Sequence, residues 1–323
     1  MDARLWCVPR QALARARGHD RGVTETVPVG TELPTRLRER VVDLEAAGGV
    51  VGMSATDLAT GRHLGHREDE LFPLASVIKL PVLVTLYEEV LAGRADLRER
   101  VTYRAMAKVP GSGVLKDLDD GATFTLRDLA VLMMTVSDNT AAEMLTQRLG
   151  KPRVESAMHA YGLPTIHMPL GVRALLYELV DMDWSQPGGY DEARERLRVS
   201  AGSGGRAVIP EQSDRSSPAD MCRLMELLER REILDPGACE DVLEILRRNH
   251  SDSRIPALLP KGTVVAHKTG TIRGVRNDVG IVEAPTGPYA VAILSRGVPS
   301  DIRTDVRIAE ISLAIWEAFT TGS

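Results

Sequence analysis

A serine and a lysine three residues apart are the first pair in this chain that could do chemistry. The segment FPLASVIKLPVL, residues 72–83, places Ser76 and Lys79 at positions i and i+3. On a helix, side chains with this spacing share one face and lie about 5–6 Å apart. Pro81 is tolerated mainly in a first helical turn, so it predicts a helix that starts near Ser76. A partly neutral lysine there could take the serine proton; the ordinary alternative is a capping serine followed by a solvent-exposed lysine.

Two further polar motifs each interrupt an apolar stretch. TVSDNTAAEML holds Ser137 and Asn139 just before a helical pattern, and VVAHKTGTI places Lys268 inside an apolar strand. A buried lysine without a partner is costly, so its position in a strand asks for a reason. Gly270 would let a ligand or another backbone approach closely. Taken alone, Ser137 or Asn139 could simply cap a helix.

The bulk composition is that of an ordinary globular protein. Of 323 residues, 43% are hydrophobic and 26% are charged, and the formal net charge is −5. No basic stripe with interleaved aromatic residues occurs, which argues against a nucleic-acid partner. No stretch approaches the roughly 18 apolar residues that span a bilayer, and residues 1–22 lack the apolar core of a secretory signal. We therefore expect a cytoplasmic protein with a small-molecule substrate and neither nucleic-acid nor membrane partners.

The cysteines predict neither a disulfide framework nor a zinc site. Cys7, Cys222 and Cys239 are an odd number and none of them stands in CxxC spacing,. We expect them to be buried or idle thiols.

The order of predicted elements is helix, two strands, many helices, three strands and a final helix. The first helix is predicted to take Thr35 as its N-cap, and a hairpin with ATGR as its turn follows,. Apolar residues recur at helical spacing in 77–92, 126–136, 140–149, 154–161, 218–230 and 239–249,. TVVAHKTGTI, NDVGIVEA and YAVAILSRG then predict three strands, before a helix over about 301–319.

This order predicts an α/β (α+β) fold. Its centre would be a five-stranded antiparallel sheet, flanked by the N- and C-terminal helices, with an inserted all-helical lobe. Residues 1–34 would be an irregular extension and residues 35–323 the domain, with a sheet lobe (35–75 and 260–323) and a helical lobe (76–259). A cleft between two such lobes is a natural place for a site.

One long segment stands apart in composition. Residues 185–218 are rich in glycine, serine and charge, and predict a long surface excursion. It could shape a pocket for an unusual substrate, or be a tolerated surface insertion.

Together and in this order, S-x-x-K, S-D-N and K-T-G are the signature of class A β-lactamases and penicillin-binding proteins. The chain resembles that superfamily, and most closely its class A branch, from about residue 35 to residue 319. FPLASVIKLPVL, SDNTAAEML and AHKTGTIRGVRNDVGIV carry the resemblance. It implies a β-lactamase/transpeptidase-like fold and a serine enzyme that works through an acyl-enzyme, with no metal or cofactor.

The resemblance also implies catalytic roles. Ser76 would be the nucleophile and Lys79 would activate it or relay its proton. Ser137 would pass a proton to the departing nitrogen, and Lys268 would supply positive charge to Ser137 and to a substrate carboxylate. The backbone amides of Ser76 and Thr271 would form the oxyanion hole.

Substrate binding would fall to neighbouring residues of the same motifs. Asn139 would hold the side-chain amide of the substrate and orient the catalytic lysine. The residues expected near the substrate carboxylate or backbone are Thr269, Gly270, Thr271 and Arg276. Arg273 is the alternative to Arg276 as a bidentate partner of that carboxylate, and simple surface charge is the alternative for both.

The sequence departs from the class A pattern in the loop after S-D-N. Enzymes of that class carry a glutamate there, which activates the water that hydrolyses the acyl-enzyme. YGLPTIHMPLGVRALLYELVDMDW has no Glu-x-x-Leu-Asn motif, and matching Gly162 to the glycine at the start of that loop puts Val172 in the place of the glutamate. A missing general base costs about 10²–10⁴-fold in rate. Nearby residues could replace it or be ordinary structural or surface residues: Glu178, Asp181, Asp183, His159 and His167.

Three functions therefore stay open. The leading one is a serine hydrolase of class A β-lactamase type, acting on a β-lactam or a related amide or ester. The second is a cytoplasmic biosynthetic acyltransferase or esterase whose acyl acceptor is not water. The third is a penicillin-binding or sensor protein that is acylated without turnover.

Overall fold

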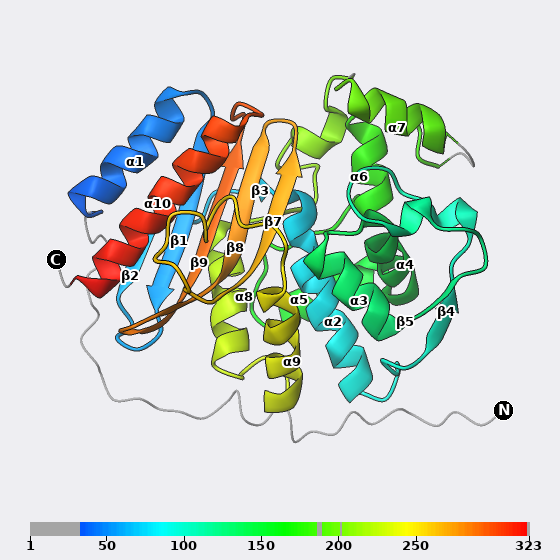
Figure 1. Cartoon of the computed structure of the whole chain (residues 1–323), viewed down its shortest axis with the longest axis horizontal. Coiled ribbons are helices and arrows are strands. Elements are labelled where there is room, and N and C mark those ends of the chain that lie inside the picture. Colours follow the sequence, from blue (N-terminus) through cyan, green and yellow to red (C-terminus); the bar gives the residue numbers. More distant parts are fainter. Residues whose placement is uncertain (1–32, 186–188, 201, 322–323) are drawn as a thin grey trace. The chain divides into compact units, whose positions relative to one another are not determined.

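The protein is described by a computed structural model, which covers residues 33–185, 189–200 and 202–321 (Figure 1). The described residues, from Leu33 onward, form one compact unit. The irregular extension predicted for residues 1–34 lies almost wholly outside the described residues.

A five-stranded antiparallel sheet is at the centre of this unit, in the order β2-β1-β9-β8-β7. Its strands are β1 (Val50–Asp57), β2 (His63–His66), β7 (Val265–Ile272), β8 (Val275–Ala284) and β9 (Gly287–Arg296). The N-terminal hairpin joins the C-terminal strands where β1 pairs with β9, in the register Ser54↔Ala292. The carboxylate of Asp57 closes the predicted hairpin turn, because it accepts the amide hydrogens of Ala59 and Thr60. The predicted fold class and sheet are confirmed.

Helices α1 (Thr35–Ala46) and α10 (Ile302–Thr320) cover one face of the sheet, as predicted (Figure 1). Leu37 and Leu44 of α1 and Ile311 and Ile315 of α10 are almost completely buried in that layer. The N-cap prediction was wrong by one residue. Pro34 is the cap, and Thr35 is already helical and makes no capping bond.

Helices α8 (Pro218–Glu229) and α9 (Pro236–Arg247) pack on the opposite face of the sheet. The sequence places α9 three residues too late, because it missed the start signal in LDPG. There Asp235 caps the helix by accepting the Ala238 amide, and proline is the first helical residue,.

The remaining helices lie beside the sheet and share its apolar core. They are α2 (Lys79–Leu91), α3 (Leu126–Thr135), α4 (Asn139–Leu149), α5 (Lys151–Ala160), α6 (Val172–Glu178) and α7 (Tyr190–Arg198). Short strands pair as β3 (Phe72–Pro73) with β6 (Arg215–Ser216) and β4 (Arg100–Thr102) with β5 (Thr123–Thr125). One apolar cluster continues from Leu294 in the sheet to Leu83 and Leu129 in the helices. The predicted lobe boundaries at 75/76 and 259/260 stay predictions.

The segment predicted as a surface excursion has regular structure in its described parts. It contains α7 and a 3-10 turn over Gly205–Val208, and Ala193 and Ala207 within them are fully buried. Because these side chains pack inward, the segment is part of the folded unit.

Candidate functional site

A single 3-10 turn, η1 (Ala75–Ile78), carries Ser76 and leads directly into α2. Pro81 lies in the first turn of α2, as its missing amide hydrogen requires,. Ala75 has a φ of +48°, which is unusual for a residue with a β-carbon,. Such a conformation persists only where the surrounding structure enforces it. Ser76 lines a cavity of about 340 Å³.

Strand β7 runs so close to η1 that residue 270 has to be glycine. A β-carbon at Gly270 would lie 2.4 Å from the carbonyl oxygen of Leu74 and 3.0 Å from Cγ2 of Val77. From the next strand, the Asn277 side chain donates to the carbonyl oxygens of Pro73 (2.8 Å) and Leu74 (3.1 Å). The sheet therefore positions the serine segment, and the close neighbour of the glycine is another backbone.

Lys79 is completely buried beside the S-D-N segment. Its Nζ donates to the carbonyl oxygen of Ser137 (2.7 Å), to Ser137 Oγ (3.1 Å) and to Asn139 Oδ1 (2.8 Å). Burial lowers the pKa of Lys79 well below its usual value, the charge of Lys268 lowers it further, and Asp138 acts in the opposite direction. In its neutral form the amine has two hydrogens and one lone pair, so it donates to only two of these three oxygens at a time and can accept a proton.

The S-D-N segment is capped by its aspartate. Asp138 Oδ1 accepts the amide hydrogen of Ala141 (2.9 Å), while Oδ2 accepts those of residues 114 and 115. The alternative prediction, that Ser137 or Asn139 caps the helix, is therefore wrong. The side chains of both residues face Lys79 instead. Ser137 has a φ of +54°, so the segment has strained backbone next to its polar side chains,.

A neighbouring loop supports this segment, and the sequence reasoning missed it. Ser112 lines the cavity, and its Oγ donates to the carbonyl oxygen of Ser137 (2.8 Å). A β-carbon at Gly113 would lie 2.4 Å from Cα of Asp138, so the loop packs directly on the S-D-N backbone. The signal was the G-S-G sequence, since glycines of positive φ mark such close approaches,.

Lys268 is completely buried in β7, and its Nζ donates to the carbonyl oxygen of Thr269 (2.8 Å). Burial lowers the pKa of Lys268 to about 7, with Asp278 opposing the shift and Arg254 adding to it. The charge of this lysine therefore changes near neutral pH.

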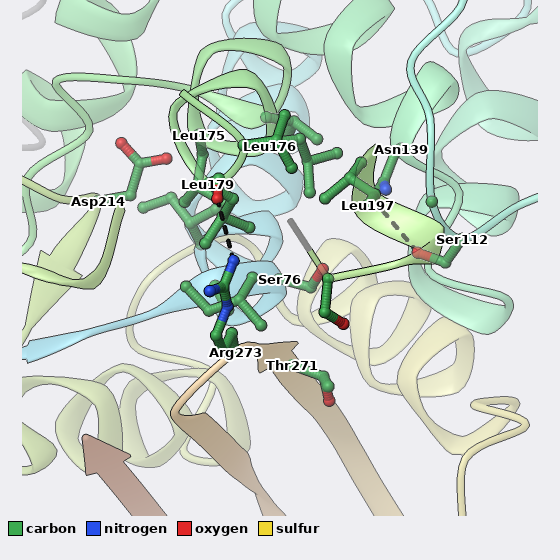
Figure 2. A pocket seen from close by; sticks show the side chains of 17 residues that line it. Ser76, Ser112, Asn139, Leu175, Leu176, Leu179, Leu197, Asp214, Thr271 and Arg273 are labelled. Atoms are coloured by element: carbon green, nitrogen blue, oxygen red, sulfur yellow. Dashed lines mark hydrogen bonds between the residues drawn. The ribbon is translucent and has the colours of Figure 1, made fainter. Parts of the chain in front are cut away.

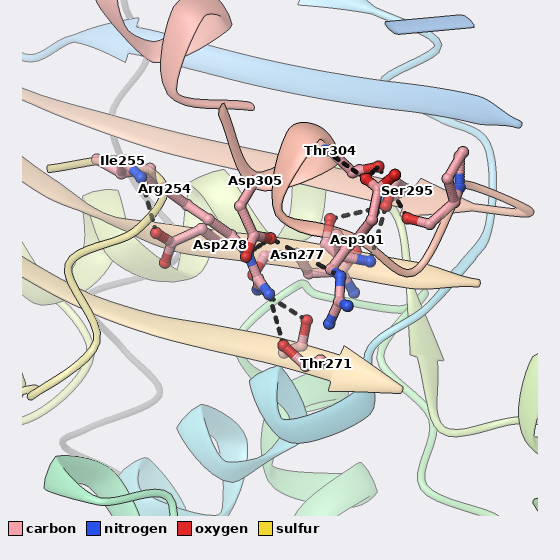
Figure 3. Close-up of polar contacts among 12 residues, drawn as sticks. Arg254, Ile255, Thr271, Asn277, Asp278, Ser295, Asp301, Thr304 and Asp305 are labelled. Atoms are coloured by element: carbon pink, nitrogen blue, oxygen red, sulfur yellow. Dashed lines mark hydrogen bonds and ion pairs between the residues drawn. The ribbon is translucent and has the colours of Figure 1, made fainter. Parts of the chain in front are cut away.

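Arg254, in the loop after α9, is a second residue that the sequence reasoning missed. Its buried guanidinium donates to Thr271 Oγ1 (2.6 Å), to the carbonyl oxygens of Gly270 (3.0 Å) and Asn277 (2.6 Å), and to Asp305 Oδ1 (2.7 Å) (Figure 3). It fixes both the backbone and the hydroxyl at the end of the K-T-G motif. Nothing in its local sequence distinguishes it from a surface arginine.

Arg276 and Arg273 have different surroundings. Arg276 Nε lies 3.8 Å from the same Asp305 oxygen that binds Arg254, and burial lowers the pKa of Arg276. Two guanidinium groups thus share one carboxylate beside Thr271. Arg273 lines the cavity and donates to the carbonyl oxygen of Leu179 (Figure 2). It also donates to the carbonyl oxygen of Gly202.

The wall of the cavity away from Thr271 is mostly apolar, with Ser200 as its polar member (Figure 2). It is formed by residues 172–185, 189–200 and 202–208, which we call the cover segment. Six aliphatic side chains of this segment line the cavity: Val172, Leu175, Leu176, Leu179, Val180 and Leu197. Val172 stands where the resemblance places the glutamate of class A enzymes.

The residues considered as substitutes for that glutamate have other partners. Glu178 binds Arg206, and Asp181 accepts hydrogen bonds from Ser203. Asp183 accepts hydrogen bonds from the amide and the hydroxyl of Ser185. None of these carboxylates is among the described residues that line the cavity.

The two histidines considered as substitutes for the glutamate also lie outside the lining of the cavity. His159 and His167 meet edge to face with ring centroids 5.0 Å apart, and neither is among the described residues that line the cavity. Asp214 does line it, but its carboxylate accepts the amide hydrogens of Leu170 and Gly171, while burial raises its pKa to about 6. Figure 2 shows Asp214 on the far side of the pocket from Ser76.

In the described part of the chain, no group of three or more histidine, cysteine, aspartate or glutamate side chains could hold a metal ion. No helix in the same residues is long and apolar enough to cross a membrane.

Curated relatives resemble this chain over most of its length. A protein named beta-lactamase regulatory protein BlaB, from Streptomyces cacaoi, is 28% identical over 79% of this chain and 87% of its own. A beta-lactamase from Bacillus licheniformis is 28% identical over 83% of this chain and 78% of its own.

Solved structures resemble it in fold. A beta-lactamase from Sphaerobacter thermophilus has a TM-score of 0.75 at 27% identity, over 89% of this chain and 98% of its own. A point mutant of PBP-A, solved as an acyl-enzyme complex with penicillin-G, has a TM-score of 0.73 at 27% identity, over 91% of this chain and 100% of its own. The family model described as "Beta-lactamase enzyme family" matches residues 34–319. With this match and the arrangement of its motifs, the chain belongs to the beta-lactamase enzyme family.

Proposed function

We propose that this protein is a β-lactamase-like serine enzyme in which a β-lactam, or a related amide or ester, acylates Ser76, and that water releases the acyl group slowly. One observation supports both the acylation of Ser76 and the slow release of the acyl group. The fully buried Lys79 is held by Ser137 and Asn139, whereas the apolar Val172 stands where a water-activating carboxylate would be expected.

In the acylation step, Ser76 Oγ attacks the substrate carbonyl and forms a new C–O bond, while neutral Lys79 takes the hydroxyl proton. The backbone amides of Ser76 and Thr271 would stabilise the oxyanion. Collapse of the tetrahedral species breaks the bond to the leaving nitrogen or oxygen. That atom receives a proton from Ser137, whose Oγ lies 3.1 Å from Lys79 Nζ and is reprotonated from it,.

A substrate carboxylate would bind at the end of β7. Lys268, Thr269 and Thr271 would contact it, and the positive potential of Arg254 and Arg276, which share one aspartate, favours an anion there,. Gly270 serves the approach of β7 to η1, and Asn139 would hold an amide on the acyl side.

Two alternatives keep specific support. The apolar cover segment disfavours an ordered water and so favours an acyltransferase or esterase with another acceptor,. The Streptomyces cacaoi relative is named as a regulatory protein, which favours a sensor that is acylated without turnover.

Intact-protein mass spectrometry after mixing with benzylpenicillin tests the proposal. We expect wild type and Ser156→Ala, an exposed serine on α5, to gain the mass of the whole β-lactam and to keep it for minutes to hours. Ser76→Ala should gain none. An adduct that also forms on Ser76→Ala would contradict the assignment of the nucleophile.

Turnover separates the alternatives. Rapid loss of the adduct with product accumulation would show an efficient lactamase and contradict slow release. Loss only after an amine or alcohol is added would identify an acyltransferase.

A further inference from the structure

The cover segment contributes to a second hollow besides the cavity beside Ser76. That cavity has a polar wall, formed by η1, α4 and the end of β7, and an apolar wall formed by the cover segment. The second hollow, of about 330 Å³, lies between α4, the start of α5 and another face of α6, and we call it the outer pocket. No described residue lines both spaces. The volume of the outer pocket is typical of small-molecule sites.

The outer pocket has buried polar groups without partners in its lining. Thr146 of α4 is 4% exposed, and its Oγ1 has no hydrogen-bond partner among the described residues. Nε of Arg173, at the start of α6, is in the same state. Buried polar groups are nearly always hydrogen-bonded, so each of these calls for an explanation. Rotation about χ1 exchanges the threonine hydroxyl and methyl, so the hydroxyl can turn to a ligand without a change in the shape of the pocket.

Lys151, at the start of α5, brings a positive charge to the outer pocket. Its Nζ donates to the carbonyl oxygens of Pro169 (2.7 Å) and Leu170 (3.1 Å). An ammonium group has three hydrogens, so one remains for a ligand when only the described residues are counted. Because the two carbonyl oxygens hold the ammonium group in place, a ligand would bind it with little further cost of ordering.

The one carboxylate among the described lining residues already has partners. Glu143 Oε1 accepts a hydrogen bond from Gln147 Nε2 (2.9 Å), and its Oε2 accepts the amide hydrogen of Arg173 (3.1 Å). Since Lys151 and Arg173 also line the pocket, its described lining has one positive charge in excess. A lining with cations and unpaired donors favours an anion that is rich in acceptors, such as a carboxylate.

An exposed tryptophan gives the outer pocket an aromatic surface. Trp184 is 39% exposed, and the ammonium nitrogen of Lys151 lies 5.8 Å from its ring centroid. Leu170 and Ala174 are aliphatic members of the same lining. An indole ring attracts a second aromatic ring, either stacked or edge to face. A ring that carries a carboxylate therefore matches both the aromatic surface and the adjacent charge.

We propose that the outer pocket binds a small aromatic carboxylate, whose ring contacts Trp184 and whose carboxylate accepts hydrogen bonds from Lys151 and Thr146. A cavity of about 150 Å³ accommodates benzene. The outer pocket, at about 330 Å³, therefore has room for a ligand of the size of benzoate. The inference is independent of the proposed acylation of Ser76, because it uses no residue of that site.

NMR of the ¹⁵N-labelled protein gives the first test. The chain has three tryptophans, Trp6, Trp184 and Trp316, and the variant Trp184→Phe identifies the indole signal of Trp184. Benzoate should shift this signal until it saturates. Benzamide, which has the same ring without the charge, should bind at least about tenfold more weakly. The inference is overturned if benzoate leaves the Trp184 signal unmoved, or if benzamide binds as tightly as benzoate.

A pair of lysine variants tests the charge. Lys151→Met should raise the Kd of benzoate at least about tenfold, because it removes a charged donor. Lys261→Met, at an exposed position before β7, should leave Kd unchanged. Equal affinities in the two variants would overturn the inference. Should circular dichroism show that Lys151→Met is unfolded, the threonine variant described next replaces it.

Thr146→Val separates ligand binding from a structural role of the hydroxyl. It keeps the shape of the side chain and removes a buried group without a partner, so Tm of the free protein should not fall. Kd for benzoate should nevertheless rise several-fold. Thr320→Val is the control, since the Thr320 hydroxyl donates to the carbonyl oxygen of Trp316 (2.8 Å) within α10, and Kd should not change. An unchanged Kd in Thr146→Val would overturn the proposed contact and with it the inference.

Discussion

The two walls of the cavity are built on different principles. Behind the polar wall lie buried side chains with several partners: Lys79 has three hydrogen bonds, and Arg254 contacts four residues. On the wall formed by the cover segment, aliphatic side chains line the cavity, and the charged pair Glu178–Arg206 lies outside its lining.

The difference separates acylation from deacylation. Close backbone approaches fix the geometry of the polar wall, so residues such as Gly270 and Gly113 cannot be enlarged without moving the nucleophile segment or the S-D-N segment. The apolar wall needs only the right volume and tolerates many aliphatic combinations. We propose that acylation depends on the first wall, and that substrate choice and the fate of the acyl group depend on the second.

Of the substitutions predicted here to change a reaction rate, a carboxylate introduced into the apolar wall should have the largest effect. Val172 lines the cavity at the first residue of α6, where a carboxylate is also favoured by the helix dipole,. Val172→Glu should raise the rate of deacylation by about 10²-fold, towards the contribution of a general base. Loss of the acyl adduct over time measures it.

Val172→Gln is the control, since it has the same shape without a basic group. If glutamine accelerates deacylation as much as glutamate, the effect comes from opening the cover segment to water, and the division between the walls is wrong.

The loss of the Lys268 charge at high pH should have an intermediate effect on the rate of acylation. Burial lowers the pKa of Lys268 to about 7, so the lysine is charged below this pH and neutral above it. The second-order acylation rate with benzylpenicillin, which carries a carboxylate, should therefore fall about tenfold per pH unit above 7 relative to that with neutral p-nitrophenyl acetate.

The ratio of the two rates between pH 5.5 and 9 removes the titration of Lys79, which affects both substrates. A ratio independent of pH would show that the polar wall does not use the charge of Lys268 to bind the carboxylate.

A smaller effect is expected from enlarging the glycine between the two backbones. Gly270→Ala forces its β-carbon against the Leu74 carbonyl, so β7 and η1 must separate. We expect acylation to slow several-fold and the free energy of unfolding to fall by about 1–3 kcal/mol. Stopped-flow acylation and urea unfolding measure the two effects.

Gly237→Ala on α9 is the matched substitution. Its new β-carbon would meet only Asp235 Oδ1, at 3.4 Å, so helix propensity should raise stability by about 0.5–1 kcal/mol,. Unchanged acylation in Gly270→Ala would mean that the spacing of the two backbones matters less than their contact suggests.

The sequence predicts the polar wall far better than the apolar wall. Ser76, Lys79 and Lys268 stand in short motifs whose local structure follows from proline, glycine and strand patterns, and the sheet follows from its alternating runs. Arg254 could not be predicted, because its role comes from tertiary contacts with strands more than ten residues away. Asp138 was overlooked as the cap because its neighbours are equally good capping residues.

The apolar wall could not be predicted from the sequence for a different reason. The chain between α6 and α7 is interrupted by glycine and charge, and α7 itself is rich in arginine and glutamate, so its composition is typical of an exposed loop. Only Ala193 and Leu197 face inward, which is too little periodicity to reveal the packing,.

The two ends of the cover segment are held together at its base. The Asp214 carboxylate bridges the amides of Leu170 and Gly171, and His167 pairs with Arg215 as an isolated β-bridge. Residues 167–171, where the chain enters this region, therefore lie next to residues 214–215, where it leaves. Residues 172–213 can therefore be regarded as an exchangeable cassette: replacing it between those anchors would give the same nucleophile a new acyl preference, with the sheet and its lysines left in place.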